Sequence, residues 1–373
     1  MRIGMRPGMR SLLEVLGGHL GQRNFNDSEW TDLLEVAEEE NVLSWVSERL
    51  RHQENAQTAE QRKRLNEIQR AAQISTFVWI ETLKSILSAF HVAGLPVVSL
   101  KGPCLAERFY GDASLRTSYD LDLLVRKSDL TGAERVLTGL GFIPHRQPDD
   151  YHQSWSRKGI DVELHHDVEN PLAFEFGVDA AWDRAQLSQF HGVSVWLLAP
   201  SDELLFLCLH AIRHRFERLC LLLDLELAFR SIGLSYSRML ERRGREFDNV
   251  LVLGWMMAAR LDPVIPPPQG VQVSPQERRR LEHLADRLWQ ERMIAPAPVL
   301  DWAAQHRFYL EVETPGWQRS LRRWRHWHIL LTRLIDADFE FAERFRLRRN
   351  WQVRLLRPVR LIIKMITASP RTQ

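Results

Sequence analysis

The pattern Asp120-Leu121-Asp122, directly before the apolar run Leu123-Leu124-Val125, constrains this chain more than any other feature. A short apolar run of this kind predicts a buried strand. Side chains alternate between the two faces of a strand, so the two carboxylates share one face about 7 Å apart. Like charges this close are costly unless a cation offsets them. The pattern therefore predicts half of a divalent-metal site.

A glycine turn lies upstream, in Ser99-Leu100-Lys101-Gly102-Pro103. Gly102 offers backbone room and N–H groups for a phosphate, whereas Pro103 lacks an N–H but suits the first turn of a helix. Together with the paired aspartates, the turn predicts phosphoryl or nucleotidyl transfer. Taken alone, each motif has a plainer interpretation, namely an ordinary strand-end turn and solvated acids at a strand edge.

Length and composition limit the class of protein. At 373 residues the chain is too long for one compact core, so two or three domains are expected. Three cysteines without a CxxC pair argue against a disulfide framework and a structural zinc site. The sequence has no run of 18 uncharged apolar residues, and its start lacks the apolar core of a signal peptide. We expect a cytoplasmic protein with no transmembrane segment.

The net charge is only +2, but the C-terminal segment is strongly basic. From Trp317 onward, 14 Lys or Arg residues face 4 Asp or Glu residues, and tryptophans are interleaved with them, as in the stretch 322–327. Such a region binds nucleic acid or an anionic membrane surface, or else packs its Trp and Leu side chains on the core. We favour packing and keep an anionic partner as the alternative.

The order of predicted elements divides the chain into three domains. Helical periodicity with a Thr58/Gln61 capping box and candidate caps at Asn26, Asp27 and Ser28 predicts a helical domain over 1–92. Short strands at 97–100, 121–125, 152–157 and 160–165, with an edge strand at 193–197, predict a small mixed sheet with helices on one side over 93–199. Apolar helical stretches then predict a helical domain with a basic tail over 200–373.

The motifs of the central domain resemble a known superfamily. Leu100-Lys101-Gly102, Tyr110-Gly111, Arg116 with Ser118, and the Asp120-Leu121-Asp122 strand are similar to the core of DNA-polymerase-β-like nucleotidyltransferases. More narrowly, they resemble the bacterial uncharacterised nucleotidyltransferase family, as do Glu163-Leu164-His165 and the segment 355–361. The resemblance implies an α/β (α+β) polymerase-β-like core with a small mixed sheet, flanked by mainly helical regions.

The resemblance also implies an activity and its residues. An acceptor would attack the α-phosphorus of a nucleoside triphosphate and expel pyrophosphate, with Mg²⁺ or Mn²⁺ held by Asp120, Asp122 and Glu163 in a two-metal mechanism. Asp161 lies on the same strand face and is the rival third ligand; resemblance, not spacing, favours Glu163. The residues implied for the triphosphate are Lys101, Gly102, Arg116 and Ser118. Arg116 could instead neutralise the aspartates, and Ser118 could cap a local turn.

The histidines have plainer interpretations. His165 and His166 adjoin Glu163, and we expect a polar strand end there, with support for Glu163 as the alternative. His210 and His214 have metal-ligand spacing without an intervening acid, which favours a packed, hydrogen-bonded pair. Asp224, in an apolar helix, should pair with an arginine.

The sequence leaves the nucleotide and the acceptor open. A small hydroxylated molecule, an RNA or a protein would each suit the expected chemistry. Two other functions remain as alternatives. One is a catalytically silent nucleotide-binding or scaffold protein, which Pro103 favours. The other is an RNA-binding protein that uses the basic C-terminal region, with steep salt dependence.

Overall fold

The structure of the chain is a computed structural model. It describes residues 5–18, 24–53, 57–145, 151–168, 176–232 and 247–295, with short pieces between 308 and 360. The chain divides into two compact units, Met1–Thr314 and Pro315–Gln373. All elements named below belong to the first unit. The Trp-rich stretch 322–327 lies outside the described residues, so the expectation of a packed basic end stays a prediction.

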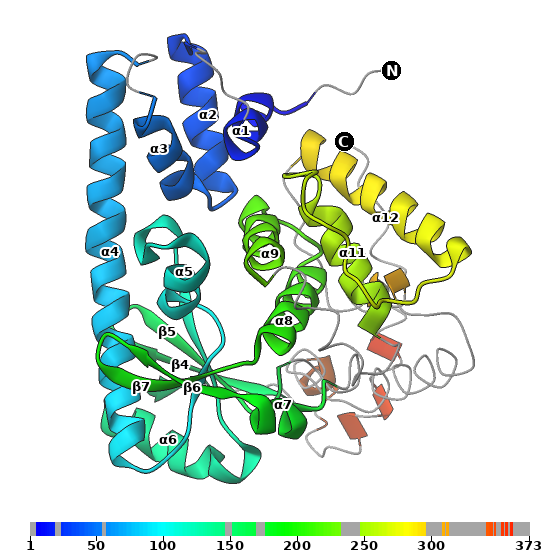
Figure 1. Cartoon of the computed structure of the whole chain (residues 1–373). Helices are drawn as coiled ribbons and strands as arrows, with labels where there is room; N and C mark the ends of the chain where they lie inside the picture. The colour runs from blue at the N-terminus through cyan, green and yellow to red at the C-terminus, as the bar shows by residue number, and fades with distance from the viewer. Residues whose placement is uncertain are drawn as a thin grey trace. The chain divides into compact units, whose positions relative to one another are not determined.

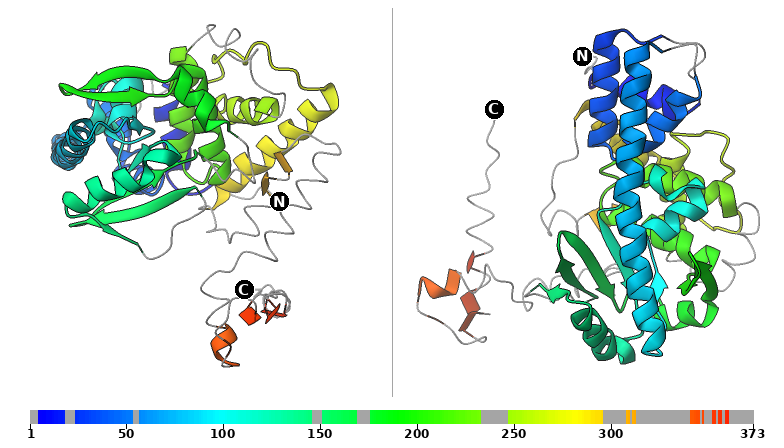
Figure 2. Two further views of the ribbon diagram at one scale, coloured as in Figure 1. Left: turned by 90° about the horizontal axis from the view of Figure 1, so that it is seen from below. Right: turned by 90° about the vertical axis from the view of Figure 1, so that its left-hand side faces the viewer.

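Four helices begin the chain, and the last of them is long. They are α1 (Met9–Leu16), α2 (Asp27–Glu39), α3 (Leu43–Arg51) and α4 (Ala59–Val92). Thr58 forms the predicted capping box that starts α4, and of the candidate caps before α2 it is Asn26 that caps the helix, also in a capping box. The first part of α4 packs against α3, and its last turns reach the sheet, as Figures 1 and 2 show. This single helix therefore connects the N-terminal helices to the central sheet.

The central sheet is mixed, and the described residues contribute seven strands in the order β3-β4-β5-β2-β1-β7-β6. The strands are β1 (Val98–Ser99), β2 (Asp120–Leu124), β3 (Ile143–Pro144), β4 (His152–Arg157), β5 (Ile160–His165), β6 (Gln186–Phe190) and β7 (Val193–Leu197). The expectation that 193–197 forms an edge is wrong. β7 lies between β1 and β6, because the 186–190 segment, which lacks a strong apolar alternation, pairs with it and becomes the edge.

Short helices connect these strands: α5 (Pro103–Tyr110), the 3₁₀ turns η2 (Ala113–Leu115) and η3 (Lys127–Asp129), α6 (Leu130–Gly139) and α7 (Val178–Arg184). Leu121 and Leu123 face a core built with α4 and α6. The opposite face is also partly covered, since Val98 and Leu124 join a second core, which corrects the expectation of helices on one side only. Asp120 and Asp122 alternate with Leu121 and Leu123, so they point away from α4 and α6.

The chain continues with the helices α8 (Pro200–Arg213) and α9 (Leu219–Ile232), followed by α11 (Asp248–Ala258) and α12 (Pro275–Ile294), which agrees with the apolar helical stretches expected there. These helices pack on one another and form a large part of the second core, together with residues of α1, α2 and α3. An ion pair between Arg108 of α5 and the buried Glu203 of α8 connects these helices to the strand-connecting helices, with Arg108 Nη2 2.6 Å from Glu203 Oε2. The three cysteines are free, and none of the described helices is long and apolar enough to cross a membrane.

Candidate functional site

Strand register brings two of the predicted acids together. β2 and β5 are parallel neighbours, and in this register Asp122 lies opposite Glu163 while Asp120 lies opposite Asp161. Asp122 is only 1% exposed, whereas Asp161 is exposed. Residues two apart on a strand share a face, so all four acids project on the same side of the sheet. Glu163 is the acid that lies next to the buried member of the pair.

His165 completes this group. Its Nε2 atom is 3.2 Å from Asp122 Oδ1 and 3.2 Å from Glu163 Oε2. In the part of the chain that the structure describes, Asp122, Glu163 and His165 form one group whose possible metal-ligand atoms all lie within 4.8 Å of one another. His165 is the last residue of β5, as expected, but it is 1% exposed and contacts both acids, so its contacts favour the alternative of support for Glu163. Its position two residues after Glu163 was the available signal.

Lys101, which follows β1, reaches the same carboxylate. The backbone N–H of Leu100 donates to the carbonyl oxygen of Asp122 at 2.9 Å, which fixes the end of β1 beside β2. The buried Lys101 side chain then places its Nζ atom 3.1 Å from Asp122 Oδ2. The ammonium group, predicted for the triphosphate, thus lies against the acidic group in this structure.

Gly102 makes the turn from β1 into α5 at a φ of 75°, a left-handed conformation that disfavours residues with a side chain. A Cβ atom at this position would lie 3.4 Å from Leu121 Cδ2 and 3.7 Å from the backbone oxygen of Asp120. The turn therefore runs close beside the start of β2. Pro103 is the first residue of α5, where its missing N–H costs no helical hydrogen bond.

Arg116 is tied to α9. Its Nε and Nη2 atoms donate to the two carboxylate oxygens of Asp224 at 2.8 and 2.9 Å, and Tyr110 donates its hydroxyl to the same carboxylate at 2.6 Å. The prediction that Asp224 pairs with an arginine is confirmed. The pair anchors the loop that leads into β2, and Ser118 lies half-buried in that loop.

The acids carry more negative charge than their neighbours offset. The charge of Asp122, together with burial, raises the pKa of Asp120 to about 6. Burial acts to raise the pKa of Asp122, but Lys101 and the hydrogen bond from His165 outweigh it and hold that pKa far below its ordinary value. Burial likewise opposes ionisation of Glu163, and the His165 hydrogen bond lowers its pKa nonetheless. The repulsion between the carboxylates therefore acts mainly on Asp120, whose ionised form is disfavoured.

This donor set fits a divalent cation. Hard cations such as Mg²⁺ take a few carboxylate oxygens and complete their coordination with water and phosphate oxygens. Asp122 and Glu163 offer such oxygens within one small space, and Asp120 lies close enough for their charges to raise its pKa. A cation would relieve that repulsion.

Two aromatic residues and an arginine border the acids. The His152 ring stacks on His165 with centroids 5.1 Å apart, and its Nε2 atom is 3.8 Å from Glu163 Oε1. Tyr151 packs beside His152 and accepts a hydrogen bond from Arg213 Nη1 at 2.7 Å. Neither Tyr151 nor His152 has a sequence pattern that marks it.

His210 of α8 and His214, which caps the C-terminal end of this helix, pack together with ring centroids 4.7 Å apart. Each has its own partner: Arg213 Nη2 lies 3.1 Å from His210 Nδ1, and His214 Nδ1 lies 3.0 Å from Glu217 Oε1. Burial and the charge of Lys101 lower the pKa of His210. The packed-pair interpretation is confirmed.

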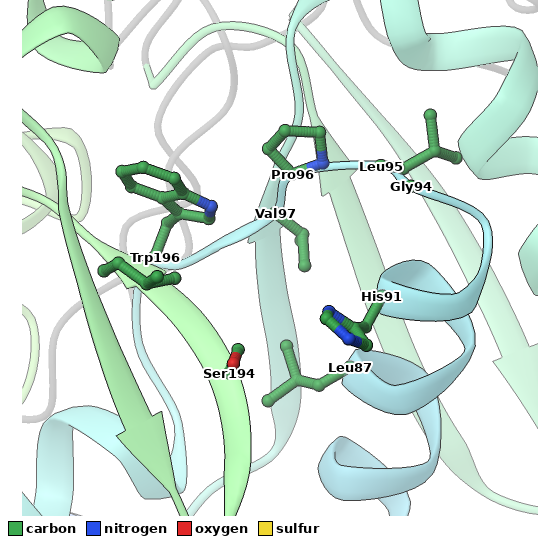
Figure 3. Close-up of a pocket in the computed structure, with 9 residues that line it drawn as sticks. Leu87, His91, Gly94, Leu95, Pro96, Val97, Ser194 and Trp196 are labelled. Carbon is green, nitrogen blue, oxygen red and sulfur yellow. The ribbon is translucent and has the colours of Figure 1, made fainter.

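A cavity of about 310 Å³ lies away from the acids. Figure 3 shows Leu87 and His91 of α4 facing Ser194 and Trp196 of β7 across it. Val97, which lines it, precedes β1, whereas Lys101 follows β1, so the cavity lies at the opposite end of this strand from the acids.

Comparison with known sequences gives one family. The model of a family described as "Uncharacterised nucleotidyltransferase" matches residues 26–249, which include every acid and cation described above. No curated protein matches the sequence.

Solved structures show only distant likeness. The antibiotic-resistance factor ANT(2'')-Ia aligns with a TM-score of 0.33 at 15% identity, over 43% of this chain and 86% of that one. An antigenic nucleotidyltransferase-like protein from Paracoccidioides brasiliensis aligns with a TM-score of 0.30 at 14% identity, over 44% of this chain and 88% of that one. JHP933 from Helicobacter pylori aligns with a TM-score of 0.26 at 14% identity, over 58% of this chain and 93% of that one.

Proposed function

Because the chain belongs to the uncharacterised nucleotidyltransferase family, we propose that it transfers a nucleoside monophosphate from a nucleoside triphosphate to an acceptor, with Mg²⁺ or Mn²⁺ as cofactor. One observation carries the proposal. Asp122 of β2 and Glu163 of β5 lie opposite each other with possible metal-ligand atoms within 4.8 Å, beside a third acid whose pKa is raised by their charge. Convergent carboxylates of this kind suit phosphoryl chemistry assisted by divalent cations.

In this proposal Asp120, Asp122 and Glu163 hold the metal. When bound, the metal supplies positive charge that stabilises the transferring phosphate and the leaving pyrophosphate. Glu163 is preferred to Asp161 because Glu163 lies beside the buried Asp122, while Asp161 is exposed. Lys101 orients Asp122 through the 3.1 Å contact between Nζ and Oδ2.

The triphosphate would be bound by Lys101, Gly102, Arg116 and Ser118. The turn at Gly102 brings the start of α5 next to Asp120, so a phosphate near the acids would also meet the positive end of this helix. Arg116 contributes through its fixed position, since Asp224 holds its guanidinium in the loop that precedes β2. Pro103 removes one N–H from this turn, so Lys101 and the remaining backbone groups carry the binding.

The three-domain division stays part of the proposal: a helical domain over 1–92, the catalytic core over 93–199 and a helical domain with a basic tail over 200–373. We propose a cytoplasmic location, as in a bacterial enzyme. The acceptor is a small hydroxylated molecule, an RNA or a protein. An anionic acceptor would bind to the basic tail.

The test is transfer of label from defined phosphates. The full chain is incubated with Mg²⁺, a cell extract and each of the four nucleoside triphosphates, labelled either at the α- or at the γ-phosphate. We expect one α-labelled acceptor and no γ-labelled one, with transfer lost in Asp122→Asn and kept in the matched control Asp161→Asn. Transfer of the γ-label would indicate a kinase instead. Nucleotide binding without transfer would indicate the catalytically silent alternative.

A further inference from the structure

His165 lies between two of the proposed metal ligands. Its Nε2 atom is 3.2 Å from an oxygen of Asp122 and 3.2 Å from an oxygen of Glu163. The ring is 1% exposed and stacks on His152 with an interplanar angle of 24°. Burial and stacking restrict the ring, so its position relative to the two carboxylates is well defined.

The contacts of this ring indicate which of its nitrogens carries a hydrogen. Ionised carboxylates only accept hydrogen bonds, so a nitrogen in contact with two of them must be a donor. Nε2 therefore carries a hydrogen. The other ring nitrogen, Nδ1, is buried and has no hydrogen-bond partner among the residues that the structure describes. It is consequently the nitrogen that can remain without a hydrogen at the lowest cost.

A metal ligand would need the reverse arrangement. A histidine that binds a metal through Nε2 carries its hydrogen on Nδ1, and metal-bound histidines almost always donate that hydrogen to an acceptor. In the described part of the chain Nδ1 has no acceptor, and a buried N–H without a partner is unfavourable because it loses its hydrogen bonds to water. The surroundings of His165 therefore favour a donor at Nε2 over a ligand.

We propose that His165 is a positioning residue that donates from Nε2 to Asp122 and Glu163 and does not bind the metal itself. The inference rests on the function proposed above. A carboxylate has about four lone-pair sites, so each acid can accept this hydrogen bond and still bind a cation. His165 thus holds the carboxylates of Asp122 and Glu163 in a fixed orientation before the metal binds.

The two roles differ in what can replace the imidazole. A donor role is met by glutamine, whose side-chain amide also presents N–H groups, and is abolished by leucine. An imidazole ligand would give the site a nitrogen and shift its preference towards zinc-like metals, whereas a donor leaves an all-oxygen site that suits Mg²⁺ and Mn²⁺.

Mn²⁺ binding to the full chain distinguishes these roles. Electron paramagnetic resonance gives the affinity, and electron spin echo modulation detects any nitrogen bound to Mn²⁺, with ¹⁵N-histidine labelling for assignment. His165→Gln and His165→Leu are compared with the control His52→Gln, which changes an exposed histidine of the α3 end. Circular dichroism and Mg²⁺ competition accompany each variant.

We expect no histidine nitrogen coupling in the wild type, wild-type affinity in His165→Gln and the control, and a ten- to hundredfold weaker affinity in folded His165→Leu. A histidine coupling that disappears in His165→Gln would overturn the proposal and leave the metal site intact. Unchanged affinity in His165→Leu would also overturn it. If the wild type binds no Mn²⁺ at millimolar concentration, the proposed metal site itself is wrong, and this inference falls with it.

Discussion

Replacing Asp120 with Asn should stabilise the metal-free protein at neutral pH. In the folded chain the pKa of Asp120 is raised from 3.8 to about 6, so folding disfavours its ionised form. The penalty is absent below about pH 3.8, grows as the pH rises, and is complete above about pH 6. At 1.36 kcal/mol for each unit of pKa shift, Asp120→Asn should raise the free energy of unfolding by about 3 kcal/mol at pH 7 and by about 0.6 kcal/mol at pH 4. Because Asp120 is partly exposed, solvent screening makes 3 kcal/mol an upper value.

The assay is urea unfolding in the presence of a chelator, followed by tryptophan fluorescence at pH 4 and pH 7. Asp120→Asn should unfold at a higher urea concentration than the wild type at pH 7, and the gap should nearly close at pH 4. Asp161→Asn, which removes the exposed acid opposite Asp120 in the register, should stay within about 0.5 kcal/mol of the wild type. A variant no more stable than the wild type at pH 7, or a gap independent of pH, would refute the repulsion between Asp120 and Asp122.

Three further outcomes follow from the same geometry. Millimolar Mg²⁺ or Mn²⁺ should raise the melting temperature of the wild type, because binding stabilises the folded state, and a rise of equal size in Asp122→Asn would contradict the assignment. Glu163→Gln should lose label transfer by orders of magnitude while Asp161→Asn keeps it, and the reverse result would make Asp161 the third ligand. Asp224→Asn leaves the Arg116 guanidinium buried without its carboxylate and should cost about 3–5 kcal/mol in urea unfolding; a loss below 1 kcal/mol would show that the pair does not anchor the loop.

Local signals in the sequence predicted most elements of the fold. The capping box of Thr58 and Gln61 starts α4 as expected, because the signal lies within one helical turn. The strands 152–157 and 160–165 have the predicted bounds, joined by Lys158 and Gly159, both at positive φ, as a tight hairpin turn requires. Each of these features depends on residues close in sequence.

Pairing between distant segments was harder to predict. The place of β7 inside the sheet depends on β6, whose sequence lacks a clear strand pattern. The contact of Lys101 with Asp122 and that of His165 with both acids depend on which strands are neighbours, and sheet order is not encoded by local periodicity. Alternation alone predicted that Asp120 and Asp122 share a face, but not which other residues meet them there.

The most direct test of the proposed site is anomalous diffraction from crystals grown with Mn²⁺ and a non-hydrolysable analogue of the nucleoside triphosphate that the protein binds. We predict Mn²⁺ between the carboxylates of Asp120, Asp122 and Glu163, with phosphate oxygens of the analogue completing its coordination and His165 outside it. Mn²⁺ bound elsewhere, or a triphosphate bound away from Lys101 and Gly102, would contradict the proposed nucleotidyl-transfer site.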